Sequence, residues 1–138
     1  MYLLIDIGNT RIKWQQRDEK NIISSGSVLV ENFMDIDLTE IKLLKKVIVS
    51  NVNHSIVLDK VKENLIHFDC PIIEVISESN EELINDYTDQ STLGVDRWLA
   101  AMGAWKIYGE DVIVINAGTA ITIDLIQIDQ KRKAHFRG

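Results

Sequence analysis

Asp6 is a carboxylate placed where it could meet a ligand. It follows the apolar run Leu3–Ile5, which predicts a buried strand, and it precedes Gly8. A carboxylate in such a place is costly to bury unless a partner or an ion meets it. A glycine lets the backbone turn or approach a ligand closely. The pattern therefore indicates a ligand-binding turn; an ordinary tight hairpin is the alternative, because Gly-Asn is a common turn pair.

The same arrangement returns in the second half of the chain. Another apolar strand ends in a polar side chain, Asn116, followed by Gly118 and by strand-like alternation. Residues 6–10 align with residues 116–120 without a gap. Strand alternation after the first glycine argues against a Rossmann turn or a P-loop, since both need a helix there. Two such hairpins facing each other would present N–H groups and hydroxyls from two sides, which is a clamp suited to a polyphosphate.

A third group of residues lies in the sequence LGVDRW, residues 93–98, at the start of a predicted helix. Asp96 falls in the first helical turn, where the helix dipole favours a carboxylate. Arg97 could bind a carboxylate through two parallel hydrogen bonds. Both residues also have ordinary explanations, because acidic residues are common at helix starts and a surface arginine commonly forms a solvated ion pair.

The elements that must position these residues predict an α/β fold with a mixed sheet. Apolar and alternating runs predict strands over residues 2–8, 10–16, 22–30, 46–50 and 71–76, and helical spacing predicts helices over residues 55–67 and 92–108. Three strands followed by alternating helices and strands is the order of a ribonuclease-H-like lobe. The hairpin over residues 112–137 would begin a second, similar lobe. We therefore expect a first lobe over residues 1–110 and an incomplete second lobe over residues 111–138.

Composition limits the class of protein. The 138 residues are 46% hydrophobic and 26% charged, which is typical of a globular chain with a real core. The net charge of −6 argues against general nucleic-acid binding. Cys70 is the single cysteine, so no internal disulfide can form, and a reduced, cytoplasmic protein is the simple expectation. No apolar run approaches the length of a membrane span, and we expect no membrane partner.

Taken together, DIGNTRIKW, LGVDRW and NAGTAITID resemble the type III pantothenate kinases, which belong to the actin-like ATPase and sugar kinase superfamily. The resemblance covers essentially the whole chain. It implies ATP-dependent phosphorylation of pantothenate to 4′-phosphopantothenate, the first step of coenzyme A biosynthesis. It also implies Mg²⁺, a monovalent cation such as K⁺ or NH₄⁺, and a homodimer.

The resemblance implies a role for each matching residue. Asp6 would hold Mg²⁺, and the phosphates of ATP would be bordered by the two hairpins, through Gly8, Asn9, Thr10, Lys13, Gly118 and Thr119. Asp96 would be the base that takes the proton from the pantothenate hydroxyl. Arg97 would bind the pantothenate carboxylate. Tyr87 and Gly94 would line the same pocket.

Two departures from the family keep a second hypothesis open. The family usually has an aspartate where this chain has Asn116, and an amide keeps one acceptor oxygen but loses the charge that would hold a metal ion. The family's chains are also nearly twice as long. The alternative is therefore a truncated or divergent homologue that binds nucleotide or a protein partner without turnover.

Overall fold

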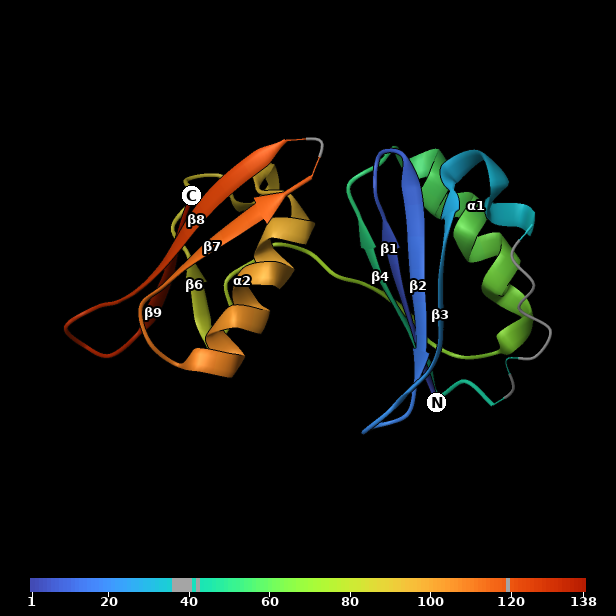
Figure 1. The fold of residues 1–138 in the computed structure, drawn as a ribbon, viewed down its shortest axis with the longest axis horizontal. Coiled ribbons are helices and arrows are strands. Elements are labelled where there is room, and N and C mark those ends of the chain that lie inside the picture. The colour runs from blue at the N-terminus through green and yellow to red at the C-terminus, as the bar shows by residue number, and fades with distance from the viewer. Residues whose placement is uncertain (36–40, 42, 119) are drawn as a thin grey trace. The chain divides into compact units, whose positions relative to one another are not determined.

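The computed structural model describes residues 1–35, 41, 43–118 and 120–138. The chain divides into two compact units, Met1–Val75 and Ile76–Gly138 (Figure 1). Each unit has its own sheet and its own hydrophobic core.

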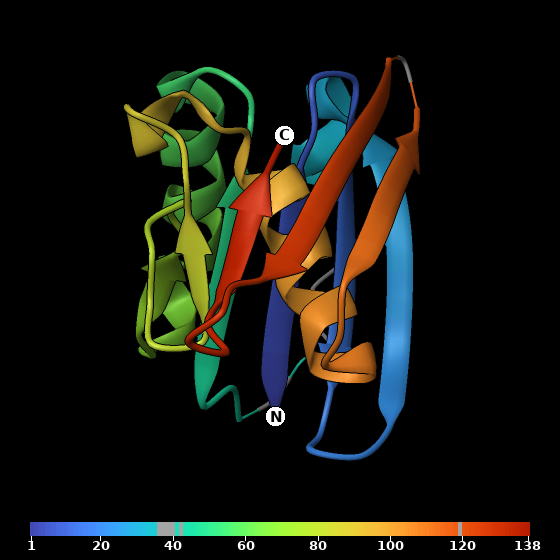
Figure 2. The same ribbon diagram turned by 90° about the vertical axis from the view of Figure 1, so that its left-hand side faces the viewer.

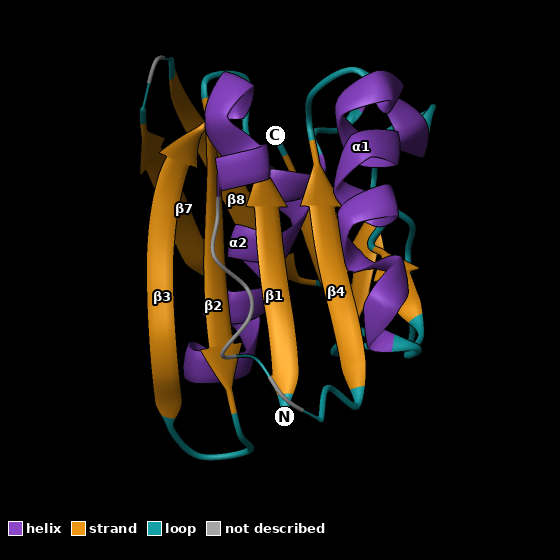
Figure 3. Ribbon diagram, turned by 90° about the vertical axis from the view of Figure 1, so that its right-hand side faces the viewer, coloured by secondary structure: helices purple, strands orange, loops and turns teal. Residues whose placement is uncertain are grey.

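The first unit is built on a five-stranded mixed sheet. Its strands are β1 (Tyr2–Ile7), β2 (Arg11–Arg17), β3 (Ile22–Leu29), β4 (Lys46–Asn51) and β5 (Ile72–Glu74). They lie in the order β3-β2-β1-β4-β5, of which β3, β2, β1 and β4 are seen side by side in Figure 3. β1 is antiparallel to β2 and parallel to β4. This is the strand order of a ribonuclease-H-like lobe, so the predicted fold class is confirmed.

One face of the first sheet packs on helix α1 (Ser55–Leu65). Leu3, Ile5 and Ile7 alternate along β1 and are at most 3% exposed. α1 contributes its buried residues at helical spacing, Leu58, Val61 and Leu65. Two short 3-10 helices, η1 (Val30–Asp35) and η2 (Ile66–Phe68), follow β3 and α1. The predicted helix over 55–67 is thus an α-helix with a tighter last turn.

The second unit has a four-stranded sheet and one long helix, shown in yellow-green to red in Figure 2. Its elements are β6 (Leu83–Asn85), η3 (Gln90–Thr92), α2 (Val95–Tyr108), β7 (Val112–Ala117), β8 (Ile121–Ile128) and β9 (Ala134–Arg137). The sheet order is β6-β9-β8-β7. Over the described ranges of the chain, no helix is both long and apolar enough to cross a membrane.

Packing joins β6 and α2 to the strands that follow them. Leu83 of β6 lies opposite Ala134 of β9 in a parallel pair. Trp98 of α2 meets Phe136 edge to face, with 5.9 Å between ring centroids. These contacts explain why the compact units of the structure divide after residue 75. The predicted lobe boundary between residues 110 and 111 follows the order of the sequence motifs instead, and it stays a prediction.

Both predicted hairpins are present, and the second is one residue shorter. In the first, the Gly8 N–H donates to the Arg11 carbonyl at 3.0 Å, and Ile7 lies opposite Ile12. In the second, the Gly118 N–H donates to the Ala120 carbonyl at 3.0 Å. Residue 117 there lies opposite residue 121. The gap-free alignment therefore holds up to the turn and shifts by one residue after it.

The β7–β8 hairpin leaves one apolar face in water. Its large members, here called the isoleucine face, are between 63% and 72% exposed: Ile113, Ile115, Ile121 and Ile123. Through the repeat these positions correspond to Leu3, Ile5, Ile12 and Trp14, and the first three of those are buried in the core of the first unit. The opposite face of the hairpin, with Val112 and Val114, packs against α2.

Candidate functional site

Asp6 sits near the end of β1 between two polar neighbours. The parallel register with β4 puts it opposite Ser50, whose Oγ donates to Asp6 Oδ1 at 3.0 Å. The antiparallel register with β2 puts it opposite Lys13, whose Nζ lies 3.9 Å from Asp6 Oδ2. The Asp6 side chain is 44% exposed, so its carboxylate has polar partners and still faces water. This is the access that an ion- or phosphate-binding group requires.

The turn after Asp6 is fixed by a residue that sequence reasoning did not single out. The Asn53 amide donates to the carbonyls of Gly8 and Asn9, at 2.9 and 3.2 Å. A Cβ atom at Gly8 would lie 3.0 Å from the Arg11 carbonyl, so a glycine suits this tight turn. Asn9 and Thr10 are exposed at its tip. The polar residues at the end of β4 were the available sign of Asn53, because polar side chains at a strand end commonly donate hydrogen bonds to a nearby loop.

The second hairpin carries fewer polar contacts. Asn116 is half-buried, and its amide donates to Thr122 Oγ1 at 3.4 Å. Gly118 is exposed at the turn. Thr119, the predicted hydroxyl of the second phosphate clamp, lies outside the described residues. The clamp formed by two hairpins stays a prediction.

Asp96 lies in the first turn of α2, as predicted. Its Oδ1 accepts a hydrogen bond from the Arg97 backbone N–H at 2.9 Å. A Cβ atom at Gly94 would lie 2.6 Å from that same oxygen, so only a glycine leaves the carboxylate this position. Asp96 itself is exposed. The carboxylate is open to water and has one backbone hydrogen bond, so a substrate could reach it, as a general base requires.

Arg97 is paired with a buried carboxylate, Asp124 of β8. Arg97 Nε donates to both carboxylate oxygens at 3.2 Å, and Nη2 also donates to Oδ1. The Arg97 side chain is 24% exposed and that of Asp124 is fully buried. Hydrogen bonding to Asp124, and to a smaller extent to Tyr87, raises the pKa of Arg97, so it is a permanent cation.

Two aromatic rings lie near this ion pair. The Arg97 guanidinium carbon lies 6.0 Å from the ring centroids of both Tyr87 and Phe136. Gly138 also lies against the pair, because a Cβ atom there would come within 3.0 Å of Arg97, Asp124 and Tyr87. Tyr87 and Arg97, predicted to line one pocket, are therefore neighbours.

Apart from those of the β7–β8 hairpin, the predicted site residues form two clusters, one in each unit. Asp6, Gly8, Asn9, Thr10 and Lys13 share the β1–β2 hairpin of the first unit. The residues predicted to handle the acid substrate share the second unit, around the start of α2: Tyr87, Gly94, Asp96 and Arg97. Asp124 was not predicted from the sequence. It could have been found as a lone acid in the apolar stretch Ile121–Ile128, which is the same kind of pattern that identified Asp6.

A second group of charges lies beside Tyr87. His135 Nδ1 is 2.8 Å from Asp86 Oδ1, and its Nε2 is 3.4 Å from Asp129 Oδ2. Arg137 Nε donates to Asp86 Oδ2 at 2.9 Å. Hydrogen bonding to Asp86 is the main reason why the pKa of His135 is raised. Burial alone would raise the pKa of Asp86, but its bonds with His135 and Arg137 bring it below the ordinary value.

We expect this group to make stability depend on pH. Because the folded-state pKa of His135 is raised above 6.5, protonated His135 stabilises the fold below that pH. The contribution is lost as pH rises through the folded-state pKa. Urea unfolding should show His135→Gln to be less stable than the parent by about 1 kcal/mol or less near pH 5.5. The difference should vanish near pH 9.

The matched control is His54→Gln, since His54 is exposed and makes no side-chain capping bond at α1. It should leave the unfolding curve unchanged at both pH values. A His135→Gln effect that stays constant with pH would contradict the assignment of the stabilisation to the charged ring.

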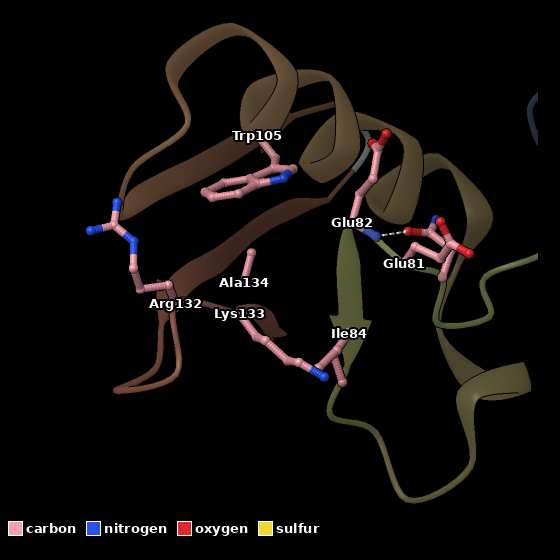
Figure 4. A pocket seen from close by; sticks show the side chains of 8 residues that line it. Glu81, Glu82, Ile84, Trp105, Arg132, Lys133 and Ala134 are labelled. Carbon is pink, nitrogen blue, oxygen red and sulfur yellow. Dashed lines mark hydrogen bonds between the residues drawn. The ribbon is translucent and has the colours of Figure 1, made fainter.

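A pocket of about 300 Å³ lies in the second unit, apart from the predicted site (Figure 4). Trp105, Ile84 and Ala134 give it apolar walls, and charged side chains line it on both sides, with Arg132 on the side opposite Glu82. None of the residues that line it belongs to the predicted site. The candidate site around Arg97 therefore rests on its hydrogen bonds and charges and not on this pocket.

Comparison with known proteins gives a consistent result. The family model described as type III pantothenate kinase matches residues 2–136. A type III pantothenate kinase of Hahella chejuensis is 32% identical over 122 residues, which are 88% of this chain and 51% of the relative. One from Colwellia psychrerythraea is 35% identical over 129 residues, 91% of this chain and 52% of the relative. The chain thus spans about half the length of the curated relatives it matches.

Among solved structures, YeaZ from Pseudomonas aeruginosa aligns with a TM-score of 0.45 and 12% sequence identity. The alignment covers 99% of this chain and 63% of that one.

Proposed function

Because the chain belongs to the type III pantothenate kinase family, we propose that it supplies the acceptor-substrate site and one phosphate-binding hairpin for ATP-dependent phosphorylation of pantothenate. The product would be 4′-phosphopantothenate, which enters coenzyme A biosynthesis. The relatives are about twice as long as this chain. We therefore propose the complete reaction for a protein of the relatives' length.

The arrangement at the start of α2 is the observation that carries this proposal. An exposed carboxylate, Asp96, follows a glycine that leaves it room and immediately precedes a fixed cation, Arg97. Pantothenate carries a hydroxyl that must lose a proton and a carboxylate that needs a cation. Asp96 would take the proton, and Arg97 would bind and orient the carboxylate. Tyr87 would bound the pocket on the side of Arg97.

The β1–β2 hairpin supports the phosphate end of the proposal. Gly8, Asn9 and Thr10 would border the phosphates, and exposed Lys13 would add positive charge. In the part of the chain that the structure describes, no three acidic, histidine or cysteine side chains gather as a metal site. Mg²⁺ is nevertheless compatible with Asp6, since it is commonly held by one or two carboxylates together with substrate phosphates. When bound, Mg²⁺ neutralises charge that develops on the transferred phosphoryl group.

Product formation tests the proposal. The chain would be incubated with ATP, Mg²⁺, K⁺ and pantothenate, and phosphopantothenate would be measured by mass spectrometry. A chimera, in which residues 1–137 replace the matching part of the Colwellia relative, gives the same assay in a chain of the relative's length. We expect product from the chimera. No product from it, under conditions where the parent Colwellia protein is active, would contradict the proposal.

Nucleotide binding without turnover is a second candidate, and Asn116 favours it. The family usually has an aspartate at this position, and the amide lacks the charge that would help to hold a cation. In this case the chain and the chimera would bind ATP, as measured by calorimetry, and neither would form product. The proposal also includes a monovalent cation, K⁺ or NH₄⁺, and a homodimer.

We expect Asn116→Asp in the chimera to raise turnover and to lower the Mg²⁺ or K⁺ concentration that gives half-maximal rate. The expected shift is roughly threefold to tenfold, because a partly desolvated carboxylate near a cation adds about 1 kcal/mol of attraction. Initial rates against each ion would measure it. Asn116→Ala is the control that removes the amide without adding charge. Identical curves for the parent and Asn116→Asp would exclude Asn116 from both ion sites.

A further inference from the structure

Asp124 is an ionisable side chain with no exposed surface, in the middle of an apolar strand. Its neighbours along β8 are Ile123 and Leu125, and its side chain lies on the face of the sheet where Ile126 is fully buried. An unpaired carboxylate in such a place is strongly unfavourable. Arg97 compensates for it with hydrogen bonds from Nε and Nη2.

The geometry of the pair restricts how Arg97 can move. Nε and Nη2 both donate to Asp124, so the guanidinium approaches the carboxylate side-on. The rings of Tyr87 and Phe136 lie near the guanidinium, with 6.0 Å from the guanidinium carbon to each ring centroid. The hydrogen bonds to Asp124 come from Nε and Nη2, and Tyr87 is a further hydrogen-bond partner of the guanidinium. One edge of the guanidinium is therefore fixed inside the protein, and a ligand would bind at the edge that carries Nη1.

We propose that Asp124 is a positioning residue, which holds the guanidinium of Arg97 in the orientation that receives the carboxylate of an acidic acceptor substrate. The inference rests on the proposed function of Arg97. Its physical basis is pre-organisation: an arginine held by an internal partner loses less freedom on binding than a free one. Asp124 touches neither substrate nor phosphate and acts through Arg97.

A buried ion pair could instead serve the fold alone, so the test must separate these roles. Asp124→Asn keeps the shape of the side chain and removes its charge. The position of Arg97 can be followed directly by NMR, because a held arginine gives a sharp, slowly exchanging Nε–H signal. The Trp98 indole N–H reports on the core of the second unit, where Trp98 is 1% exposed.

We expect Arg97 Nε–H to exchange with water at least tenfold faster in Asp124→Asn, because an amide oxygen accepts a weaker bond than a carboxylate does, while the Trp98 signal persists. Unchanged exchange of Arg97 Nε–H in the variant would overturn the proposal. If the variant does not fold, hydrogen exchange in the unmodified chain gives the answer. Arg97 Nε–H should exchange at least tenfold more slowly than that of Arg11, which is exposed and bonded to Ser27 Oγ. Equal rates would overturn the proposal as well.

Substrate binding provides the second arm. Pantothenate and its amide, which lacks the carboxylate, would be titrated into the unmodified chain, Asp124→Asn and Glu82→Gln. Glu82 pairs with Lys106 at the surface of the same unit and is the matched control. We expect Asp124→Asn to weaken pantothenate binding about tenfold or more and to leave amide binding unchanged. Glu82→Gln should change neither.

The two arms distinguish the possible failures. Faster exchange of Arg97 Nε–H in Asp124→Asn with unchanged pantothenate affinity would overturn the role of Asp124 in substrate binding. Equal weakening for acid and amide would mean that Asp124 supports only the fold. If the unmodified chain and the chimera bind no pantothenate, the proposed function fails, and the NMR arm still decides whether Asp124 holds Arg97.

Discussion

Asp96→Asn in the active chimera is expected to lower kcat for pantothenate phosphorylation by about 10²- to 10⁴-fold, the usual contribution of a general base. Asparagine keeps the size of the side chain and can still accept the Arg97 N–H bond through its carbonyl oxygen, but it cannot take a proton. ATP affinity should change by less than about threefold, because the phosphate-binding residues lie on other elements. Steady-state kinetics and ATP calorimetry would measure the two effects.

Asp89→Asn is the matched control for that experiment. Asp89 also accepts a backbone N–H bond at the start of a helical turn, from Ser91 at 3.1 Å, and it has no place in the site. It should leave kcat within about twofold of the parent. An Asp96→Asn protein that keeps more than half of the parent kcat would remove Asp96 from the role of base.

Replacing Arg97 is expected to have two separable effects, on stability and on substrate selection. Arg97→Met leaves the fully buried Asp124 without its partner. Breaking a buried ion pair in this way costs about 3–5 kcal/mol of unfolding free energy. The double variant Arg97→Met/Asp124→Leu removes both charges and should recover most of that loss. Urea unfolding of the parent, the single variant and the double variant would show both changes.

The double variant then isolates the effect on the substrate. Without Arg97, kcat/KM for pantothenate should fall by roughly 30- to 150-fold, which corresponds to a lost charge-assisted contact of about 2–3 kcal/mol. The loss should shrink for the amide analogue, because the analogue has no carboxylate to bind. An equal loss for acid and amide in the well-folded double variant would show that Arg97 is structural.

Local patterns were sufficient to predict the main elements. An apolar run predicted β1, and alternation predicted β2, where Ile12 and Gln16 lie on the buried face. α2 was predicted from its helical spacing, and the turn at Gly8 from the change between an apolar run and a polar tip. β6 was missed because three residues are too short to show a period. It exists through its pairing with β9, about fifty residues later in the chain.

Sequence reasoning selected candidate site residues and missed the side chains that support them. Asp6, Asp96 and Arg97 stand out because their types and positions are unusual for their elements. Asn53 and Asp124 act through distant partners: Asn53 is 45 residues from Gly8, and Asp124 is 27 residues from Arg97. A single sequence carries no record of such pairings. The exposure of the isoleucine face could not be predicted either, because an apolar alternating strand in a sequence is normally read as having a buried face.

The one-residue difference between the two hairpins has a consequence for anyone who compares or engineers them. Counterparts are 110 positions apart before the turn and 109 after it, so Lys13 corresponds to Thr122 and not to Ile123. A graft or duplication analysis with a constant offset would exchange inward and outward residues along all of β8. The strand register is therefore the alignment to use for such work, and it places an uncharged hydroxyl side chain where the first hairpin has a cation.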